Sequence, residues 1–121
     1  MPTYPDLNNK VALITGAGRA GGLGEAMALF VAEEPGPLEQ VKHFSKRTAG
    51  AETNVAIGLS RLGLAVGWQS RLGADSMARY LLAAIGSEGV DCSRVVCDAA
   101  QRTGFMFKGQ DALLIAARRG A

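Results

Sequence analysis

The chain has 121 residues, of which 48% are hydrophobic and 20% charged, and its formal net charge is +2 at neutral pH. This length suits one domain with a single core, and the composition is typical of globular proteins. The small net charge argues against a nucleic-acid partner, and no apolar run is long enough to span a membrane. The first ten residues lack the basic and apolar regions of a signal peptide, so we expect a cytoplasmic protein.

The first half of the chain contains one clear strand signal and one ambiguous segment. Residues 11–15, VALIT, form a short apolar run with β-branched members, which predicts a buried strand. Five glycines among residues 16–24 predict a loop. Residues 24–34 have the composition and apolar face of a helix, but they are also short and apolar enough for a buried strand. Both alternatives stay open here.

The second half alternates predicted helices with predicted strands. Residues 53–62 carry one apolar face and are followed by Gly63, which predicts a helix with a glycine stop. Asp75 predicts the cap of a second amphipathic helix that ends near Gly86 or Gly89. Strands are predicted at 66–70, 94–97 and 103–108, whereas residues 110–121 remain unassigned. This alternation predicts one α/β domain over residues 1–121, with a mostly parallel sheet and right-handed crossovers.

Few side chains are available to bind a metal. Cys92 and Cys97 are the only cysteines, and His43 is the only histidine. These three side chains do not make a tetrahedral zinc site, so we expect no bound metal. In a reducing cytoplasm we expect both cysteines to be buried free thiols.

The glycine loop has the features of a dinucleotide site. A strand, a glycine-rich turn and a helix start together hold a pyrophosphate, because backbone amides and the helix dipole attract the anion. The candidate residues are Gly16, Gly18, Gly22 and Gly24. The alternative is a glycine-rich turn that binds no ligand.

Residues 1–28 resemble the start of a short-chain dehydrogenase/reductase, through LNNKVALITGAG followed by GLGEAMA. The resemblance implies NAD(P) on the glycine loop, although this loop is two residues longer than the family's TGxxxGxG spacing. Glu33 or Glu34 falls where the family binds the adenosine ribose. The family's catalytic Tyr-x-x-x-Lys pair is missing, since the residue four positions after Tyr80 is Ala84 and the residue four positions after Tyr4 is Asn8. We therefore expect no dehydrogenase activity.

Residues 24–109 resemble a different family. They are similar to the N-terminal part of PfkB (ribokinase-type) sugar kinases, and most similar to 2-keto-3-deoxygluconate kinases. The segments that carry the resemblance include GEAMALFVAEEPGPLEQVKHFSKRTAGAETNVAIGLSRLG and, later, QRTGFMFKG. The resemblance implies a three-layer fragment with additional lid strands. It also implies that Gly50 and Asn54 bind the sugar, that Arg102 faces the carboxylate of an acid sugar, and that ATP is the co-substrate.

Each site residue also has a structural interpretation. Asn54 fits a residue that satisfies the backbone at a helix start, and Arg102 fits a solvated strand residue. The kinase family's Asp-Thr-x-Gly-Ala-Gly-Asp motif, which carries the general base and stabilises the transferring phosphoryl group, is not in this sequence. The sequence therefore predicts an incomplete reaction centre.

The two resemblances overlap on the letters GEAMA. We therefore expect a recombined or engineered chimera, in a fold that can differ from both parents through segment swapping. The first hypothesis is a protein with no catalytic function and no cofactor, which covers its apolar faces and strand edges as a homodimer. The second is residual binding of a sugar acid or a nucleotide. The third is a carbohydrate kinase fragment that needs a partner chain.

Overall fold

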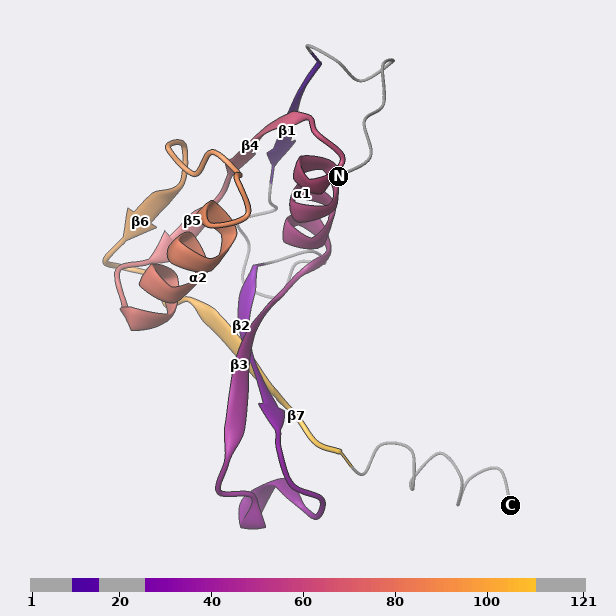
Figure 1. Cartoon of the computed structure of the whole chain (residues 1–121). Helices are drawn as coiled ribbons and strands as arrows, with labels where there is room; N and C mark the ends of the chain where they lie inside the picture. The colour runs from indigo at the N-terminus through magenta and orange to yellow at the C-terminus, as the bar shows by residue number, and fades with distance from the viewer. Residues whose placement is uncertain (1–9, 16–25, 111–121) are drawn as a thin grey trace.

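The structure is a computed structural model that describes residues 10–15 and 26–110 of the chain. Helices and short parallel strands form an α/β part, and a narrow three-stranded sheet projects from it (Figure 1). We call this projecting sheet the lid. No helix in the described ranges is long and apolar enough to cross a membrane.

The α/β part contains two pairs of parallel strands that follow one another along the chain. In the first pair, Val11 to Thr15 are in register with Ala65 to Gln69. Only Ser70 separates this pair from the second, in which Arg71 to Gly73 face Val96 to Asp98. The strands are β1 (Val11–Thr15), β4 (Ala65–Gln69), β5 (Arg71–Gly73) and β6 (Val96–Asp98).

The strand predictions are confirmed with some shifts at their ends. The strand at residues 11–15 has the predicted bounds, and the strand at 66–70 lies one residue earlier. The strand predicted at 94–97 is displaced to 96–98, and β5 was not predicted. β5 has only three residues, too few to establish an alternating pattern.

The two helices begin and end close to the predicted residues. Helix α1 (Ala51–Arg61) starts two residues before the prediction and is followed by Gly63, whose φ of 97° is left-handed, as expected of a C-terminal glycine. Helix α2 (Ser76–Gly86) is capped by Asp75, whose carboxylate accepts a hydrogen bond from the amide of Ala78. Both predictions are confirmed, because caps and glycine stops depend on local interactions.

The core lies on one face of these parallel strands. Both helices contribute to a single buried cluster around Trp68, which is fully buried. The cluster's other members are Ala26, Ala56, Val66, Leu72, Ala78, Leu81, Ile85 and Val90. The described residues therefore form two layers, a layer of strands and a layer of helices, of the expected three-layer fragment.

The lid is a separate sheet in the order β3-β2-β7. Its central strand is antiparallel to one neighbour and parallel to the other, so the lid is mixed. The strands of the α/β part pair in parallel and the lid strands form a sheet of their own, as expected, but the described strands divide among three small sheets. The lid strands are β2 (Met27–Ala32), β3 (Phe44–Ala49) and β7 (Gly104–Lys108).

The ambiguous segment is a strand where the structure describes it. Residues 27–32 form β2, and Ala28 and Ala32, on the same side of the strand, are almost completely buried. β2 pairs with β3 along its whole length and with β7 over Met27–Val31, and this pairing outweighs the helical composition of the segment. The chain then turns through Gly36, whose φ is 114°, into the short 3₁₀ helix η2 (Leu38–Gln40) at the lid's tip.

The remaining local predictions have mixed outcomes. Cys92 is half-buried but Cys97 is exposed, so the prediction of two buried thiols is wrong for Cys97. β6 has a single neighbouring strand among the described residues, and all three of its residues are exposed or half-buried. The glycine loop and residues 111–121 lie outside the described residues.

Candidate functional site

The corner between β3 and α1 contains the first predicted site residue. Gly50 connects the two elements with φ 125° and ψ 135°, a conformation that residues with a Cβ rarely adopt. Its carbonyl oxygen accepts a hydrogen bond from the amide of Asn54 and another from the hydroxyl of Thr53, each at 3.1 Å. Gly50 is therefore required by the backbone geometry of this corner, whatever binds beside it.

Asn54 is exposed on the first turn of α1. Within the described residues no hydrogen bond joins the Asn54 side chain to the helix start, where the Thr53 hydroxyl donates to the Gly50 carbonyl. Thr53 is fully buried, and the neighbouring carboxylate of Glu52 is also buried. The first turn of α1 thus turns Asn54 outward while its two preceding polar residues are held inside.

The register of the lid brings the two ends of the predicted site together. Met27, at the start of β2, lies opposite Ala49 on one side and Gly104 on the other. Neighbouring strands are about 4.8 Å apart, so Ala49 and Gly104 lie roughly 10 Å from each other. Gly50 directly follows Ala49, and Arg102 lies two positions before Gly104. Gly50 and Arg102 therefore belong to the same end of the lid.

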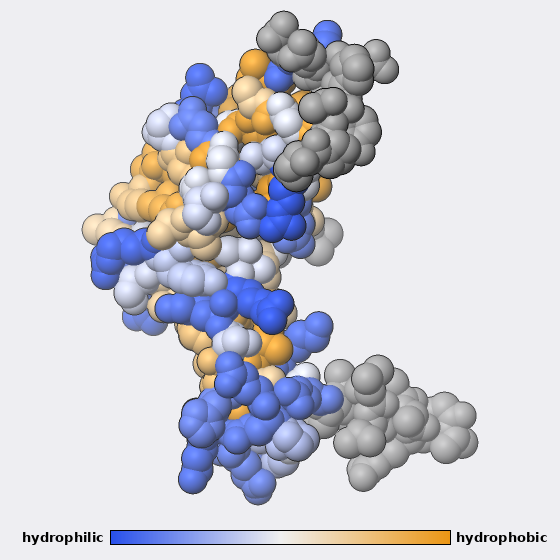
Figure 2. All heavy atoms as spheres, in the orientation of Figure 1, coloured by the Kyte–Doolittle hydropathy of each residue, from blue (hydrophilic) through white to orange (hydrophobic). Residues whose placement is uncertain are grey.

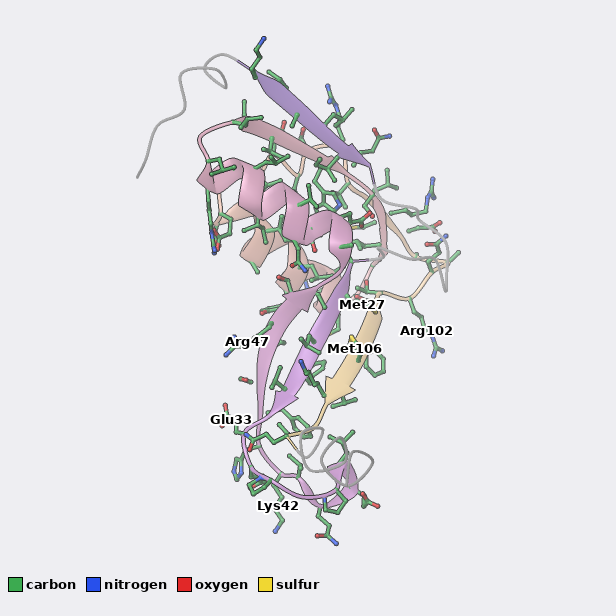
Figure 3. All side chains as sticks on the ribbon, turned by 90° about the vertical axis from the view of Figure 1, so that its right-hand side faces the viewer. Met27, Glu33, Lys42, Arg47, Arg102 and Met106 are labelled. Atoms are coloured by element: carbon green, nitrogen blue, oxygen red, sulfur yellow. The ribbon has the colours of Figure 1, made fainter. Side chains whose placement is uncertain are left out.

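Arg102 is exposed on the loop that leads into β7, and its side chain extends away from the lid strands (Figure 3). Within the described part of the chain, no hydrogen bond or ion pair joins Arg102 to Gly50 or Asn54. The structure thus places all three residues at one end of the lid, but no described hydrogen bond or ion pair joins Arg102 to the other two.

A network of hydrogen bonds fixes the loop beside Arg102. The amide of Thr103 donates to one carboxylate oxygen of Asp75 at 3.0 Å, while Ala78 donates to the other at 2.9 Å. The hydroxyl oxygen of Thr103 accepts from the amide of Gly73 at 3.0 Å. The Thr103 amide contributes most to holding the pKa of Asp75 below its usual range, because it stabilises the charged carboxylate. One carboxylate therefore caps α2 and anchors the loop that carries Arg102.

The two faces of the lid have different surroundings. The ammonium of Lys46 lies 4.5 Å from the centre of the Tyr80 ring, and the Tyr80 hydroxyl donates to the Lys46 carbonyl at 2.9 Å. Because side chains alternate along a strand, Arg47 points to the opposite face from Lys46. The register places Leu29 and Met106 in the same row as Arg47, so this face is the one turned away from α2.

The opposite end of the lid is far from this corner. Glu33 and Lys42 lie near the tip, whereas Met27 and Arg102 lie at the other end (Figure 3). The Glu34 carboxylate accepts hydrogen bonds from the amides of Lys42 and His43, and the former bond lowers the pKa of Glu34 most. β2 carries Glu33 and Glu34 to the tip of the lid, whereas the glycine loop lies outside the described residues, so the expectation that one of them binds a ribose stays a prediction.

Sequence reasoning missed several residues that shape this corner. Thr53, Asp75 and Thr103 position the backbone around Gly50 and Arg102, as the hydrogen bonds above show. The sequence indicated Asp75 only as a helix cap. Its second role, accepting a hydrogen bond from the Thr103 amide, depends on a residue 28 positions later in the chain. Among the described residues, no group of three or more His, Cys, Asp and Glu side chains lies close enough to hold a metal ion.

The α/β part with its projecting lid is similar in fold to part of a carbohydrate kinase. The family model for pfkB family carbohydrate kinases matches residues 22–112, and the chain belongs to this family. The chain is 47% identical over 88 residues to a 2-dehydro-3-deoxygluconokinase of Bacillus subtilis (strain 168), covering 72% of this chain and 27% of that protein.

Solved structures give the same assignment. A PfkB protein from Polaromonas sp. JS666 has a TM-score of 0.71 and 65% identity, over 83% of this chain and 31% of that one. A sugar kinase from Pyrococcus horikoshii, solved in complex with ATP, has a TM-score of 0.66 and 33% identity, over 80% and 29% of the two chains. The chain spans less than a third of the length of these relatives. The comparisons support the carbohydrate kinase interpretation over a protein without function.

Proposed function

We propose that this chain is the sugar-binding and lid portion of a carbohydrate kinase that acts on a 2-keto-3-deoxy sugar acid. The observation that carries the proposal is the register that brings the Gly50 corner and the Arg102 loop to one end of the lid. The similarity to the Bacillus subtilis 2-dehydro-3-deoxygluconokinase supports the choice of substrate class.

Each residue has a defined role in this proposal. The Gly50 corner lets a sugar hydroxyl approach the backbone, and the Asn54 amide offers both a donor and an acceptor to a polyol. The Arg102 guanidinium binds the carboxylate that distinguishes an acid sugar from a neutral one. ATP is the phosphate donor of the completed kinase, and the phosphoryl-transfer motif comes from the remainder of the kinase fold.

The proposal has a direct test by calorimetric titration of the purified chain with 2-keto-3-deoxygluconate. We expect measurable binding that Asn54→Ala weakens about tenfold or more, which corresponds to about 1.4 kcal/mol. Arg102→Gln should weaken binding of the sugar acid and leave binding of fructose, a neutral sugar, unchanged. Arg94→Gln, which removes an exposed arginine from another loop, is the matched control. Absence of heat with the sugar acid, or equal effects of the two arginine variants, contradicts the proposal.

We further propose that residues 11–15 occupy the position of the kinase's own first strand. The parallel pairing of β1 with β4 and a family match that starts at residue 22 support this arrangement. In that case the reductase-like segment completes the sheet without bringing reductase chemistry. Titration with NAD(P) tests whether the glycines at 16, 18, 22 and 24 retain a cofactor site, and we expect no binding.

A further inference from the structure

The row of residues across the first position of β2 is apolar and contains one large side chain. Met27 is flanked by Ala49 on one strand and by Gly104 on the other, so a methyl group and a bare backbone lie beside it. Ala28, the next residue, is fully buried on the opposite face, so Met27 points to the face turned away from α2. All three residues of the row are half-buried. A ligand that lies across this row therefore contacts the Met27 side chain.

Met27 also lies between two residues assigned to the sugar acid. Gly50 directly follows Ala49, Arg102 lies two positions before Gly104, and neighbouring strands are about 4.8 Å apart. Figure 3 shows Met27 and Arg102 at the same end of the lid. A substrate whose carboxylate binds Arg102 and whose hydroxyls bind at the Gly50 corner therefore has to cross the Met27 row.

The chemical groups of a 2-keto-3-deoxy sugar acid follow one another in the same order. The carboxylate is C1, the carbon without a hydroxyl is C3, and the hydroxyls begin at C4. The C3 methylene thus separates the group that fits Arg102 from the groups that fit Gly50 and Asn54. Met27 offers a weakly accepting sulfur and no donor, so it suits a methylene and leaves a hydroxyl without a good partner.

We propose that Met27 is a specificity-determining residue, whose side chain packs on the C3 methylene and selects 3-deoxy sugar acids over those with a hydroxyl at C3. The inference rests on the proposed function and deepens it, since Gly50, Asn54 and Arg102 recognise groups that both kinds of acid share. A hydroxyl placed against Met27 loses its hydrogen bonds to water without a replacement, which weakens binding. Apolar sites reject an added hydroxyl by roughly 100-fold at most, so the expected preference is about 10- to 100-fold.

The test measures dissociation constants of the full chain for 2-keto-3-deoxygluconate and for 2-ketogluconate, its counterpart with a C3 hydroxyl, by calorimetric titration. The parent should bind the deoxy acid about 10- to 100-fold more tightly. Met27→Gln adds an amide that can pair with the C3 hydroxyl, and it should remove most of this preference. Met27→Leu keeps an apolar side chain of similar volume and should keep the preference. Met77→Gln makes the same exchange on α2, away from this row, and should also keep it.

The ratio of the two dissociation constants separates selection by Met27 from a structural role, because a distorted lid weakens binding of both acids. The parent's own preference is measured without any variant. A parent that binds both acids equally, or an unchanged ratio in Met27→Gln, overturns the selection by Met27 and leaves the proposed function intact. Loss of the preference in Met27→Leu or in Met77→Gln also overturns it, since the apolar character of Met27 then does not set the ratio. A parent that binds neither acid rejects the proposed function together with this inference.

Discussion

Single residues at the junction of β5, α2 and β7 have little freedom to change. Gly73 is the clearest case, because a Cβ there would lie 2.6 Å from both an Asp75 carboxylate oxygen and the Gln101 carbonyl, and 2.8 Å from the Thr103 amide nitrogen. Two of these three atoms belong to the backbone and cannot move aside like the end of a side chain. The loop that carries Arg102 thus depends on a glycine that precedes Thr103 by 30 residues in the sequence and contacts it directly.

We expect Gly73→Ala to destabilise the fold by about 1–3 kcal/mol, the usual range for overpacking. Gly58→Ala is the control, because nothing lies within 4 Å of a Cβ added at that exposed helical position. Alanine there should stabilise α1 by about 0.5–1 kcal/mol. Urea unfolding followed by circular dichroism measures both changes, and a Gly73→Ala protein as stable as the parent contradicts the packing.

Asp75 introduces a pH dependence at the same junction. Hydrogen bonds from Thr103 and Ala78 hold its folded-state pKa below the unfolded value of about 4. The stabilisation is therefore present above that value and is lost as the pH falls through the folded-state pKa. We expect Asp75→Ala to cost about 1 kcal/mol at neutral pH, as for other helix caps. The difference in unfolding free energy between parent and variant should shrink below pH about 4, and a constant difference down to acid pH would exclude this origin.

At the scale of elements, the lid connects to the α/β part through few interactions. The contact of Tyr80 on α2 with Lys46 on β3 combines a hydroxyl–carbonyl hydrogen bond with a cation–π interaction. Figure 2 shows hydrophilic residues gathered over the lid's tip and more hydrophobic ones over the part above it. The Tyr80–Lys46 contact lies near the middle of the lid strands, where Lys46 pairs with Phe30, so α2 holds the lid at this point.

Removing the Tyr80 hydroxyl should loosen the lid without disturbing the core. We expect Tyr80→Phe to cost about 0.5–1.5 kcal/mol, the range for one hydrogen bond, and to speed amide hydrogen exchange in β2 and β3. Ser87→Ala is the control, because the Ser87 hydroxyl donates to Ala84 within the last turn of α2 and touches no lid strand. Faster exchange in both variants, or in neither, would show that Tyr80 does not anchor the lid.

At the scale of the whole molecule, the lid presents an aromatic face. Phe107 stacks on Phe30 with the ring centres 5.2 Å apart and meets Phe44 and Phe105 edge to face. Phe105 is 59% exposed, although large aromatic side chains gain most from burial. Exposed apolar clusters of this kind mark protein interaction sites.

We propose that the chain forms a homodimer through this aromatic face of the lid. Phe105→Lys should shift the molecule to a monomer in size-exclusion chromatography with light scattering. Val55→Lys replaces another exposed apolar residue, on α1, and should leave the dimer unchanged. A parent protein that stays monomeric at all accessible concentrations contradicts the proposal.

The sequence by itself determined the elements whose signals are local. Helix α2 was predictable because the Asp75 side chain accepts a hydrogen bond from the amide of Ala78, three residues later. Helix α1 was predictable because Gly63 adopts the left-handed conformation that stops a helix. The resemblance carried by residues 49–54, AGAETN, and by their neighbours also indicated the kinase family, which the family match over residues 22–112 then established.

The tertiary structure decided the features that depend on pairing between distant segments. Residues 27–32 became a strand because β3 and β7 supply hydrogen-bond partners on both sides, which no local pattern encodes. The same pairing brought Gly50 and Arg102 to one end of the lid, and gave Asp75 its second partner in Thr103. Backbone hydrogen bonds of a sheet join residues far apart in sequence, so only the folded chain reveals which side chains become neighbours.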